Sequence, residues 1–352
     1  MSHTVAVLAL ILSVEGVASE PPENLKPPVE NGPFLVPAPG QASEPVWGLK
    51  GGIAVGLWPT PGPRGLFRIY APYLDQPPRR MINYVAVEPI VEGRRGLSEL
   101  EPSPRDGKPG KRLWAVETPE AHPGPKDPWD RPAAGKIDEV EPGVHRLTVF
   151  FHVERFDHGA RPILELTLRE DRPFEVRFRV FAHEDSAELE SCVLSATMGN
   201  YARLRQLWLQ DQIIDATKLW DDFEPTRENW GFAPHHRWEQ DQMLIRNGEA
   251  IVAMTTDEAN PVEVEYDEAV PPWWRYEGRP ATQYWRSPAE PGLAVQLNGR
   301  LTYWATQAPI PGGMSFENFE LIAPFQPGQQ FTFGVTLEKP EALGFEIPVD
   351  PL

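Results

Sequence analysis

The stretch SFENFELIAPFQPGQQFTFGV, residues 315–335, decides the prediction of fold, because two alternating apolar runs flank a Pro-Gly turn. Alternation with a period of two is typical of a strand, and in an antiparallel sheet such a strand has one face on a core and one toward solvent. The first run also contains two acids, Glu317 and Glu320. Strict alternation places them on opposite faces of the strand, so at most one of them faces a given cleft.

The same period of two recurs through residues 144–182. There Phe174, Val176 and Phe178 face one way, whereas the charged residues between them face the other way. The tripeptide Asn-Gly-Arg at 298–300 lies between two such runs and predicts a hairpin. Helix signals are scarce. Further strands are predicted within 51–59, 65–73, 81–91, 113–117, 188–214, 248–258 and 292–307.

We therefore predict an all-β chain that folds as one large antiparallel β-sandwich over residues 48–352. Residues 20–47 are rich in proline and predict a linker or an extended arm, and residues 101–143 predict a long loop insert. The apolar run from Val5 to Val14 is too short to span a bilayer and is followed by small residues. Residues 1–19 thus resemble a signal peptide, which predicts a periplasmic or secreted protein, with an apolar N-terminal strand or tail as the alternative.

The composition limits the classes of partner and cofactor. The chain has 33 basic and 51 acidic residues, a net charge of −18, which argues against nucleic acid as a main partner. No segment after the N-terminal run is long and apolar enough to predict a membrane span. The chain has one cysteine, Cys192, so no internal disulfide is possible. The common motifs for metals, nucleotides and nucleophilic serine are absent, and we predict neither a metal nor a cofactor.

One cluster of polar residues follows a predicted strand, in the segment TMGNYARLRQLWL. Tyr201, Arg203 and Arg205 share a face there, and Asn200 precedes them. Two guanidinium groups on one face suit a carboxylate or the hydroxyl groups of a sugar, so Asn200, Arg203 and Arg205 are predicted to bind substrate. Tyr201 joins the predicted catalytic residues. A sheet face with salt bridges is the alternative.

A second cluster contains adjacent histidines, His235 and His236, between tryptophans. Neighbours on a strand point apart, so one histidine at most serves a given site, and imidazole suits proton transfer near neutral pH. Aromatic side chains in turn-like sequence suit stacking on sugar rings, and Trp273, Trp274 and Trp285 are predicted to bind in this way. Their alternative role is as anchors that pack over the sheet.

The closing segment FELIAPFQPGQQFTFGV is similar to the C-terminal end of the galactose-mutarotase-like β-supersandwich, in which an acid-bearing strand, a Pro-Gly turn and a last alternating strand follow one another. The resemblance implies that Glu320, or else Glu317, stands where aldose epimerases keep their general base. The same architecture occurs in polysaccharide lyases and in accessory domains of glycoside hydrolases, so fold by itself does not distinguish these activities.

The sequence thus predicts an exported carbohydrate-active protein that binds a sugar or a uronate in a sheet cleft. Glu320, with His235 or His236, is predicted to transfer protons, either in ring-opening epimerisation or in β-elimination next to a uronate. Two alternatives stay open. The first is a carbohydrate-binding protein without catalysis, and the second is a structural β-sandwich of a cell-surface assembly.

Overall fold

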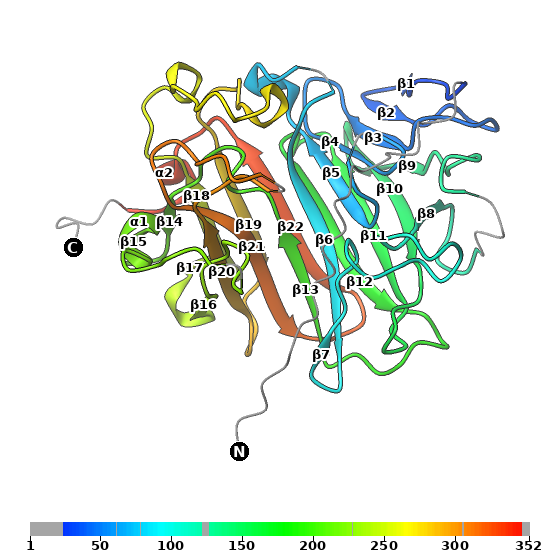
Figure 1. Ribbon diagram of the computed structural model, residues 1–352. Helices are drawn as coiled ribbons and strands as arrows, with labels where there is room; N and C mark the ends of the chain where they lie inside the picture. The colour runs from blue at the N-terminus through cyan, green and yellow to red at the C-terminus, as the bar shows by residue number, and fades with distance from the viewer. Residues whose placement is uncertain are drawn as a thin grey trace.

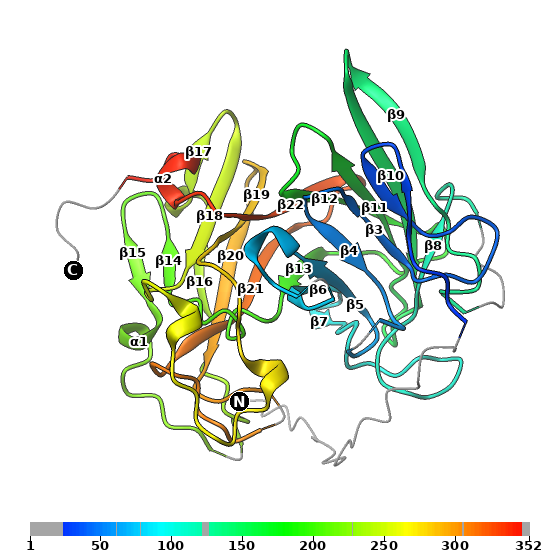
Figure 2. The ribbon, with the colours of Figure 1, turned by 90° about the horizontal axis from the view of Figure 1, so that it is seen from above.

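The computed structural model describes residues 24–346, except for residues 61, 78, 122–126, 227 and 305. The predicted signal peptide lies outside the described residues. Within them, the chain forms two antiparallel sheets of eleven strands each, packed face to face (Figures 1 and 2). This arrangement confirms the predicted all-β sandwich.

The first sheet contains strands from the N-terminal third of the chain and the strand that carries Glu317 and Glu320. Its strands, in spatial order, are β1 (Val29–Asn31), β2 (Phe34–Val36), β3 (Val46–Leu49), β4 (Ala54–Gly56), β5 (Leu66–Tyr70), β6 (Met81–Val91), β13 (Ser191–Ala196), β21 (Ser315–Pro324), β20 (Ala294–Arg300) and β16 (His236–Glu239). The short strand β7 (Arg94–Arg95) pairs with β6 and turns the chain back along it.

The second sheet packs against the first and contains the long alternating strands of the middle of the chain. Its strands, in spatial order, are β15 (Ile213–Asp215), β14 (Gln206–Trp208), β18 (Glu249–Thr255), β19 (Thr282–Pro288), β22 (Gln329–Thr336), β12 (Glu175–Ala182), β11 (Pro162–Arg169), β10 (Val144–Val153) and β8 (Leu113–Val116). Strand β17 (Leu244–Arg246) pairs with β18, and β9 (Lys136–Glu141) pairs with β10. The β9–β10 hairpin projects beyond the rest of the sheet (Figure 2).

Helices are short in the described part of the chain. The α-helices are α1 (Ala216–Leu219) and α2 (Pro340–Leu343), and the 3₁₀-helices are η1 (Pro72–Leu74), η2 (Gln240–Gln242), η3 (Pro261–Glu263) and η4 (Pro272–Trp274). Helix α1 lies in the connection from β15 of the second sheet to β16 of the first, so this segment closes one side of the sandwich.

The core lies between the two sheets and is rich in aromatic rings that meet edge to face. The ring of Phe151 in β10 forms edge-to-face pairs with the rings of Trp47 and Phe67, and the ring centroids are 5.0 Å apart in each pair. Phe67 also lies 5.3 Å from Phe178, which belongs to the alternating run of β12. These contacts join strands of both sheets, and aromatic pairs of this kind add about 0.5–1.5 kcal/mol to the burial of their area.

Two segments predicted to lie outside the regular sandwich contribute strands to it. Residues 24–47, part of the predicted arm or linker, form β1, β2 and the start of β3, and Phe34 and Val36 are buried. The predicted loop insert at 101–143 contains β8 and β9, of which the sequence indicated β8 alone. Proline-rich sequence in this chain therefore marks turns between short edge strands as well as loops.

The strand β21 departs from strict alternation, and this overturns the predicted placement of its acids. Leu297 of β20 pairs with Phe319, but Gly299 pairs with Phe316, so Asn298 alone lies opposite two residues of β21. Such a β-bulge adds one residue to one strand and changes which side chains share a face. Phe316 and Phe319, three residues apart, are both fully buried in the core.

The prediction of a hairpin at 298–300 is also wrong. Strand β20 continues through Asn298 to Arg300, and the chain turns only after it. The side-chain oxygen of Asn298 accepts a hydrogen bond from the backbone N–H of Asn318, at 3.0 Å. The asparagine therefore satisfies a backbone donor that the bulge removes from the regular ladder.

The bulge predicts how alanine substitutions in β21 change the stability of the protein. We expect Phe316→Ala and Phe319→Ala each to lower the free energy of unfolding by about 3–5 kcal/mol, because each leaves a cavity in the core. Asn318→Ala, the matched control on the other face, is expected to cost about 1 kcal/mol or less. Urea unfolding measures all three. A cost for Phe316→Ala no larger than that for Asn318→Ala would contradict the bulge.

Candidate functional site

The candidate site lies on the outer face of the first sheet, the face turned away from the core. Because Phe316 and Phe319 both point into the core, Glu317 and Glu320 both lie on this outer face. Gln296 on β20 pairs with Glu320 across the ladder, so these two side chains lie on the same face of the sheet. Sequence analysis placed the two acids on opposite faces, and that prediction is wrong.

Glu320 is buried beneath a single guanidinium group. Its carboxylate oxygens accept hydrogen bonds from Nη1 and Nη2 of Arg95, at 3.0 and 2.7 Å. The hydroxyl of Ser195, on the neighbouring strand β13, lies 3.3 Å from the same carboxylate. This two-pronged geometry is the strongest form of arginine–carboxylate contact.

Arg95 also holds a second buried carboxylate. Glu88 on β6 accepts from Nε of Arg95 at 2.7 Å and from Nη2. The short β6–β7 hairpin brings this about, because it folds Arg95 back over the outer face of the strand that carries Glu88. Two buried carboxylates therefore share one guanidinium, an arrangement in which the two acids do not have equal proton affinities.

His235 completes the cluster, which we call the Arg95 cluster and define as Arg95, Glu88, Glu320, Ser195 and His235. The Nε2 atom of His235 lies 3.5 Å from Glu320, and the ring is 41% exposed. The cluster therefore reaches solvent through the imidazole ring of His235.

His236 points to the other side of its strand. Its ring lies near Trp220 and Trp238, with centroids 5.5 and 6.0 Å apart. The structure thus brings one of the two adjacent histidines to Glu320, as their positions on a strand require.

The pKa values of the acids in the cluster move in opposite directions. Burial by itself would raise the pKa of Glu320, but contact with His235 and the charge of Arg95 outweigh burial and hold that pKa below its ordinary value. Burial raises the pKa of Glu88 well above its ordinary value, despite Arg95. Burial also raises the pKa of nearby Glu99 to about 6. The acids with raised pKa values in this part of the sheet are therefore Glu88 and Glu99.

Glu317 lies farther along the same face and is in a different electrostatic environment. Burial raises its pKa to about 7, although the positive charge of Arg300 opposes the rise. One of its oxygens, Oε2, is buried without a hydrogen-bond partner among the described residues. Glu317 is thus a carboxyl group that changes its proton near neutral pH, as a general acid or base requires.

Aromatic rings lie against Arg300, the residue whose charge acts on Glu317. The guanidinium of Arg300 lies 4.4 Å from the ring centroid of Phe232 and 5.3 Å from that of Trp304. Trp304 is 47% exposed and nearby Trp230 is 51% exposed. Exposed tryptophans beside polar groups suit the stacking of sugar rings.

The predicted tryptophans have three different environments. Trp273 in η4 is 66% exposed, whereas Trp274 stacks on Tyr303 with centroids 5.7 Å apart. Trp285 is fully buried, packs on Phe333, and donates its N–H to the carbonyl of Phe319. Trp285 is therefore a core residue without a surface for a sugar, and Trp274 anchors a loop.

The predicted guanidinium clamp is buried in ion pairs. Arg203 donates to Glu258 from Nε and Nη2, and Nη1 contacts Tyr266. Arg205 donates to Asp257 and Glu258 at 2.8 and 2.9 Å. Both side chains are buried, and both guanidinium groups are paired with carboxylates of the protein itself. The alternative role stated above, a salt-bridged face, describes both arginines.

Asn200 and Tyr201 are also inside the protein. Tyr201 packs edge to face on Tyr276, and burial raises the pKa of its hydroxyl. Both polar atoms of the Asn200 amide are buried without a hydrogen-bond partner among the described residues. The backbone N–H of Gly199 donates to the carbonyl of Glu317, so this loop lies beside the acid-bearing strand without presenting Asn200 or Tyr201 to solvent.

Sequence analysis missed Arg95, Glu88 and Arg300. Arg95 follows the run Glu-Gly-Arg, and its approach to β21 depends on a contact across 225 positions of the chain. Arg300 was part of the predicted hairpin. The described residues contain no group of three or more histidine, cysteine or acidic side chains arranged to hold a metal ion.

No protein-family model matches this sequence, and a comparison with curated proteins finds no match. Within residues 24–346, apart from the gaps stated above, no helix has the length and apolar character needed to cross a membrane.

The raised pKa of Glu317 predicts a pH-dependent stability. A pKa of about 7 in the folded state, against 4.5 as the ordinary value, means that the folded state binds the proton more tightly. The stability this group provides is then complete below pH 4.5 and is lost as the pH rises toward 7. We expect Glu317→Gln, which does not titrate, to gain about 3 kcal/mol relative to the wild type between pH 4.5 and pH 8.

Urea unfolding at both pH values measures this difference. Glu338→Gln is the matched control, because Glu338 is exposed, and we expect its stability relative to the wild type to be the same at both pH values. A Glu317→Gln variant that behaves like the control would show that Glu317 has an ordinary pKa.

Proposed function

We propose that the protein is carbohydrate-active and that it transfers protons to and from a sugar on the outer face of the first sheet. The observation that carries the proposal is that Glu317 and Glu320 share this face in different protonation states. Contact with His235 and the charge of Arg95 hold the pKa of Glu320 below its ordinary value, whereas burial raises the pKa of Glu317 to about 7. A pair of acids whose pKa values are pushed apart supplies a base and an acid from one strand.

The surroundings of the two acids support a sugar as the substrate. Exposed Trp304, whose ring lies 5.3 Å from the guanidinium of Arg300, and exposed Trp230 offer apolar rings for stacking. Asn318, between the acids on β21, and Gln296, opposite Glu320 on β20, are half-buried and offer amide groups for hydroxyls. Small-molecule sites commonly combine apolar rings with a few polar groups that fix orientation.

The proposed reaction class is proton transfer at a sugar ring. In ring-opening epimerisation, Glu320 accepts the proton of the anomeric hydroxyl while Glu317 gives its proton to the ring oxygen, and the bond between the anomeric carbon and that oxygen breaks. Reclosure reverses both transfers, so no proton is gained or lost. In β-elimination next to a uronate, the base removes the proton beside the carboxylate and the acid protonates the leaving oxygen. Neither route consumes a co-reactant.

The similarity of the closing strands to the galactose-mutarotase-like β-supersandwich supports the first route. The supporting features are an acid-bearing strand, β21, followed by a Pro-Gly turn and β22. His235 would relay the proton between Glu320 and solvent, because it lies 3.5 Å from the carboxylate and is partly exposed.

An activity screen on free aldoses and uronate polysaccharides tests the proposal. We expect Glu320→Gln and Glu317→Gln each to lower turnover by about 10²–10⁴-fold, the usual contribution of a positioned acid or base. Glu338→Gln, the exposed control, is expected to keep full turnover. Unfolding curves recorded in parallel distinguish lost chemistry from lost folding, because each variant must be folded at the assay temperature.

Two outcomes would contradict the proposal. Turnover that is unchanged in Glu320→Gln would remove the proton-transfer role. Glycan binding without turnover, retained in Glu320→Gln and lost in Trp304→Ala, would instead define a carbohydrate-binding protein without catalysis.

A further inference from the structure

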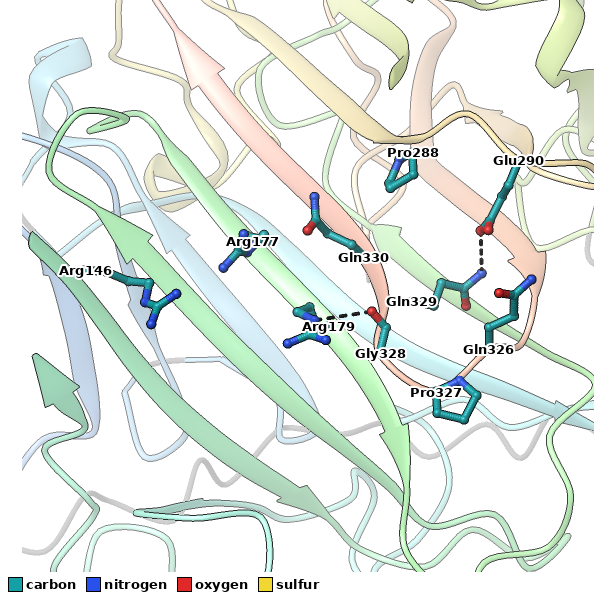
Figure 3. A pocket seen from close by; sticks show the side chains of 10 residues that line it. All are labelled: Arg146, Arg177, Arg179, Pro288, Glu290, Gln326, Pro327, Gly328, Gln329 and Gln330. Atoms are coloured by element: carbon teal, nitrogen blue, oxygen red, sulfur yellow. Dashed lines mark hydrogen bonds between the residues drawn. The ribbon is translucent and has the colours of Figure 1, made fainter. Parts of the chain in front are cut away.

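A hollow of about 530 Å³ lies on the outer face of the second sheet, on the opposite side of the sandwich from the Arg95 cluster. Its floor is formed by β10, β12 and the start of β22, and its wall by the turns that follow β19 and β21 (Figure 3). A volume in this range is typical of sites for small molecules. The residues lining it are Arg146, Arg177, Arg179, Pro288, Glu290, Gln326, Pro327, Gly328, Gln329 and Gln330.

Arginines gather on one side of this hollow because of alternation in the second sheet. Val176, Phe178 and Val180 of β12 point into the core, so Arg177 and Arg179 point outward. The pairing of β12 with β22 sets Arg179 beside Gln330. Figure 3 shows Arg146 and the two arginines of β12 on one side and the glutamines and Glu290 on the other.

Two of these arginines are neutralised by carboxylates. Arg146 contacts Asp138 of the β9–β10 hairpin at 2.6 Å. Arg179 contacts Glu165 of β11 at 3.2 Å and donates to the carbonyl of Gly328. Their positive charges are therefore largely balanced within the protein.

Arg177 differs from both, because none of the described carboxylates lies within 4.0 Å of its guanidinium. Its contact is with the hydroxyl of Thr167, at 3.4 Å, and its Nε is buried without a hydrogen-bond partner in the described part of the chain. Burial lowers the pKa of Arg177, and neighbouring Arg146 and Arg179 lower it further, against the effect of Glu165. An anion bound here would pair with the positive charge of Arg177. That charge has no described carboxylate within 4.0 Å and is already partly removed from water.

The wall of the hollow also contains neutral hydrogen-bonding groups, those of Gln326, Gln329 and Gln330. Oε1 of Gln329 is buried without a partner among the described residues. Nε2 of Gln329 donates to Glu290 and to the carbonyl of Pro324. The wall therefore offers groups to a ligand that has hydroxyls in addition to its charge.

We propose that this hollow binds a small organic oxyanion, with Arg177 as the group that recognises its charge. The planar fork of arginine matches a carboxylate as well as a sulfate or phosphate. Binding here is independent of the proton transfer proposed for the first sheet, because the two sites lie on opposite faces of the sandwich and share no residue.

Calorimetric titration of the full chain at low salt tests this proposal, with sodium glucuronate, inorganic sulfate, inorganic phosphate and neutral glucose as the probes. We expect an oxyanion to bind and glucose to bind at least tenfold more weakly. Tighter binding of glucuronate than of sulfate and phosphate identifies a sugar acid, and equal binding identifies the oxyanion by itself; both results support the proposal. Failure of all three anions to bind, or equal binding of glucose and glucuronate, overturns it.

Variants locate the binding. We expect Arg177→Gln to weaken the affinity for the bound anion at least tenfold, and Arg177→Lys, which keeps the charge but not the fork, to weaken it less. Arg94→Gln is the matched control, because it removes one charge from an exposed position on β7 of the other sheet. An affinity that is unchanged in Arg177→Gln, or lowered equally in Arg94→Gln, overturns the assignment. Thermal unfolding confirms that each variant is folded.

Discussion

One extra residue in β21, opposite Asn298, determines which side chains of β21 lie in the core and which lie on the outer face of the first sheet. Without this bulge, Phe316 would leave the core and Glu317 would enter it, since successive side chains of a strand alternate between faces. With it, both phenylalanines fill the core and both acids reach the outer face. The bulge is held by a hydrogen bond from the backbone of Asn318 to the side chain of Asn298. The site on the first sheet therefore depends on a backbone irregularity more than on any single functional side chain.

Charge is distributed over the two outer faces in contrasting ways. On the first sheet, acids outnumber the cation that holds them, because Glu88 and Glu320 share Arg95. Such a cluster keeps one acid ionised and leaves the other with a proton. On the second sheet the balance is reversed at Arg177, which has a hydroxyl and no described carboxylate as its partner. The two proposed sites therefore have charge imbalances of opposite sign.

The sequence predicted what depends on local periodicity. The all-β class and the long strands of residues 144–182 follow from alternation that needs no long-range information. The sequence did not predict the bulge, because Asn-Gly-Arg is compatible both with a turn and with a strand segment that lies opposite a bulge. Arg203 and Arg205 were expected to bind substrate, but Glu258, more than fifty positions farther along the chain, occupies both of them. The sequence alone does not show which carboxylate folds onto which arginine, because these pairings form only with the tertiary structure.

The central claim is that Glu317 and Glu320 lie on one face in different protonation states. Carbon-13 NMR of the glutamate carboxyl groups, recorded as a function of pH, tests it most directly, with Glu317→Gln and Glu320→Gln to assign the two signals. We predict a midpoint near pH 7 for Glu317 and a midpoint below the ordinary glutamate value for Glu320. Two signals that titrate together near pH 4.5 would contradict the account, because neither acid would then experience the buried environment that the bulge creates.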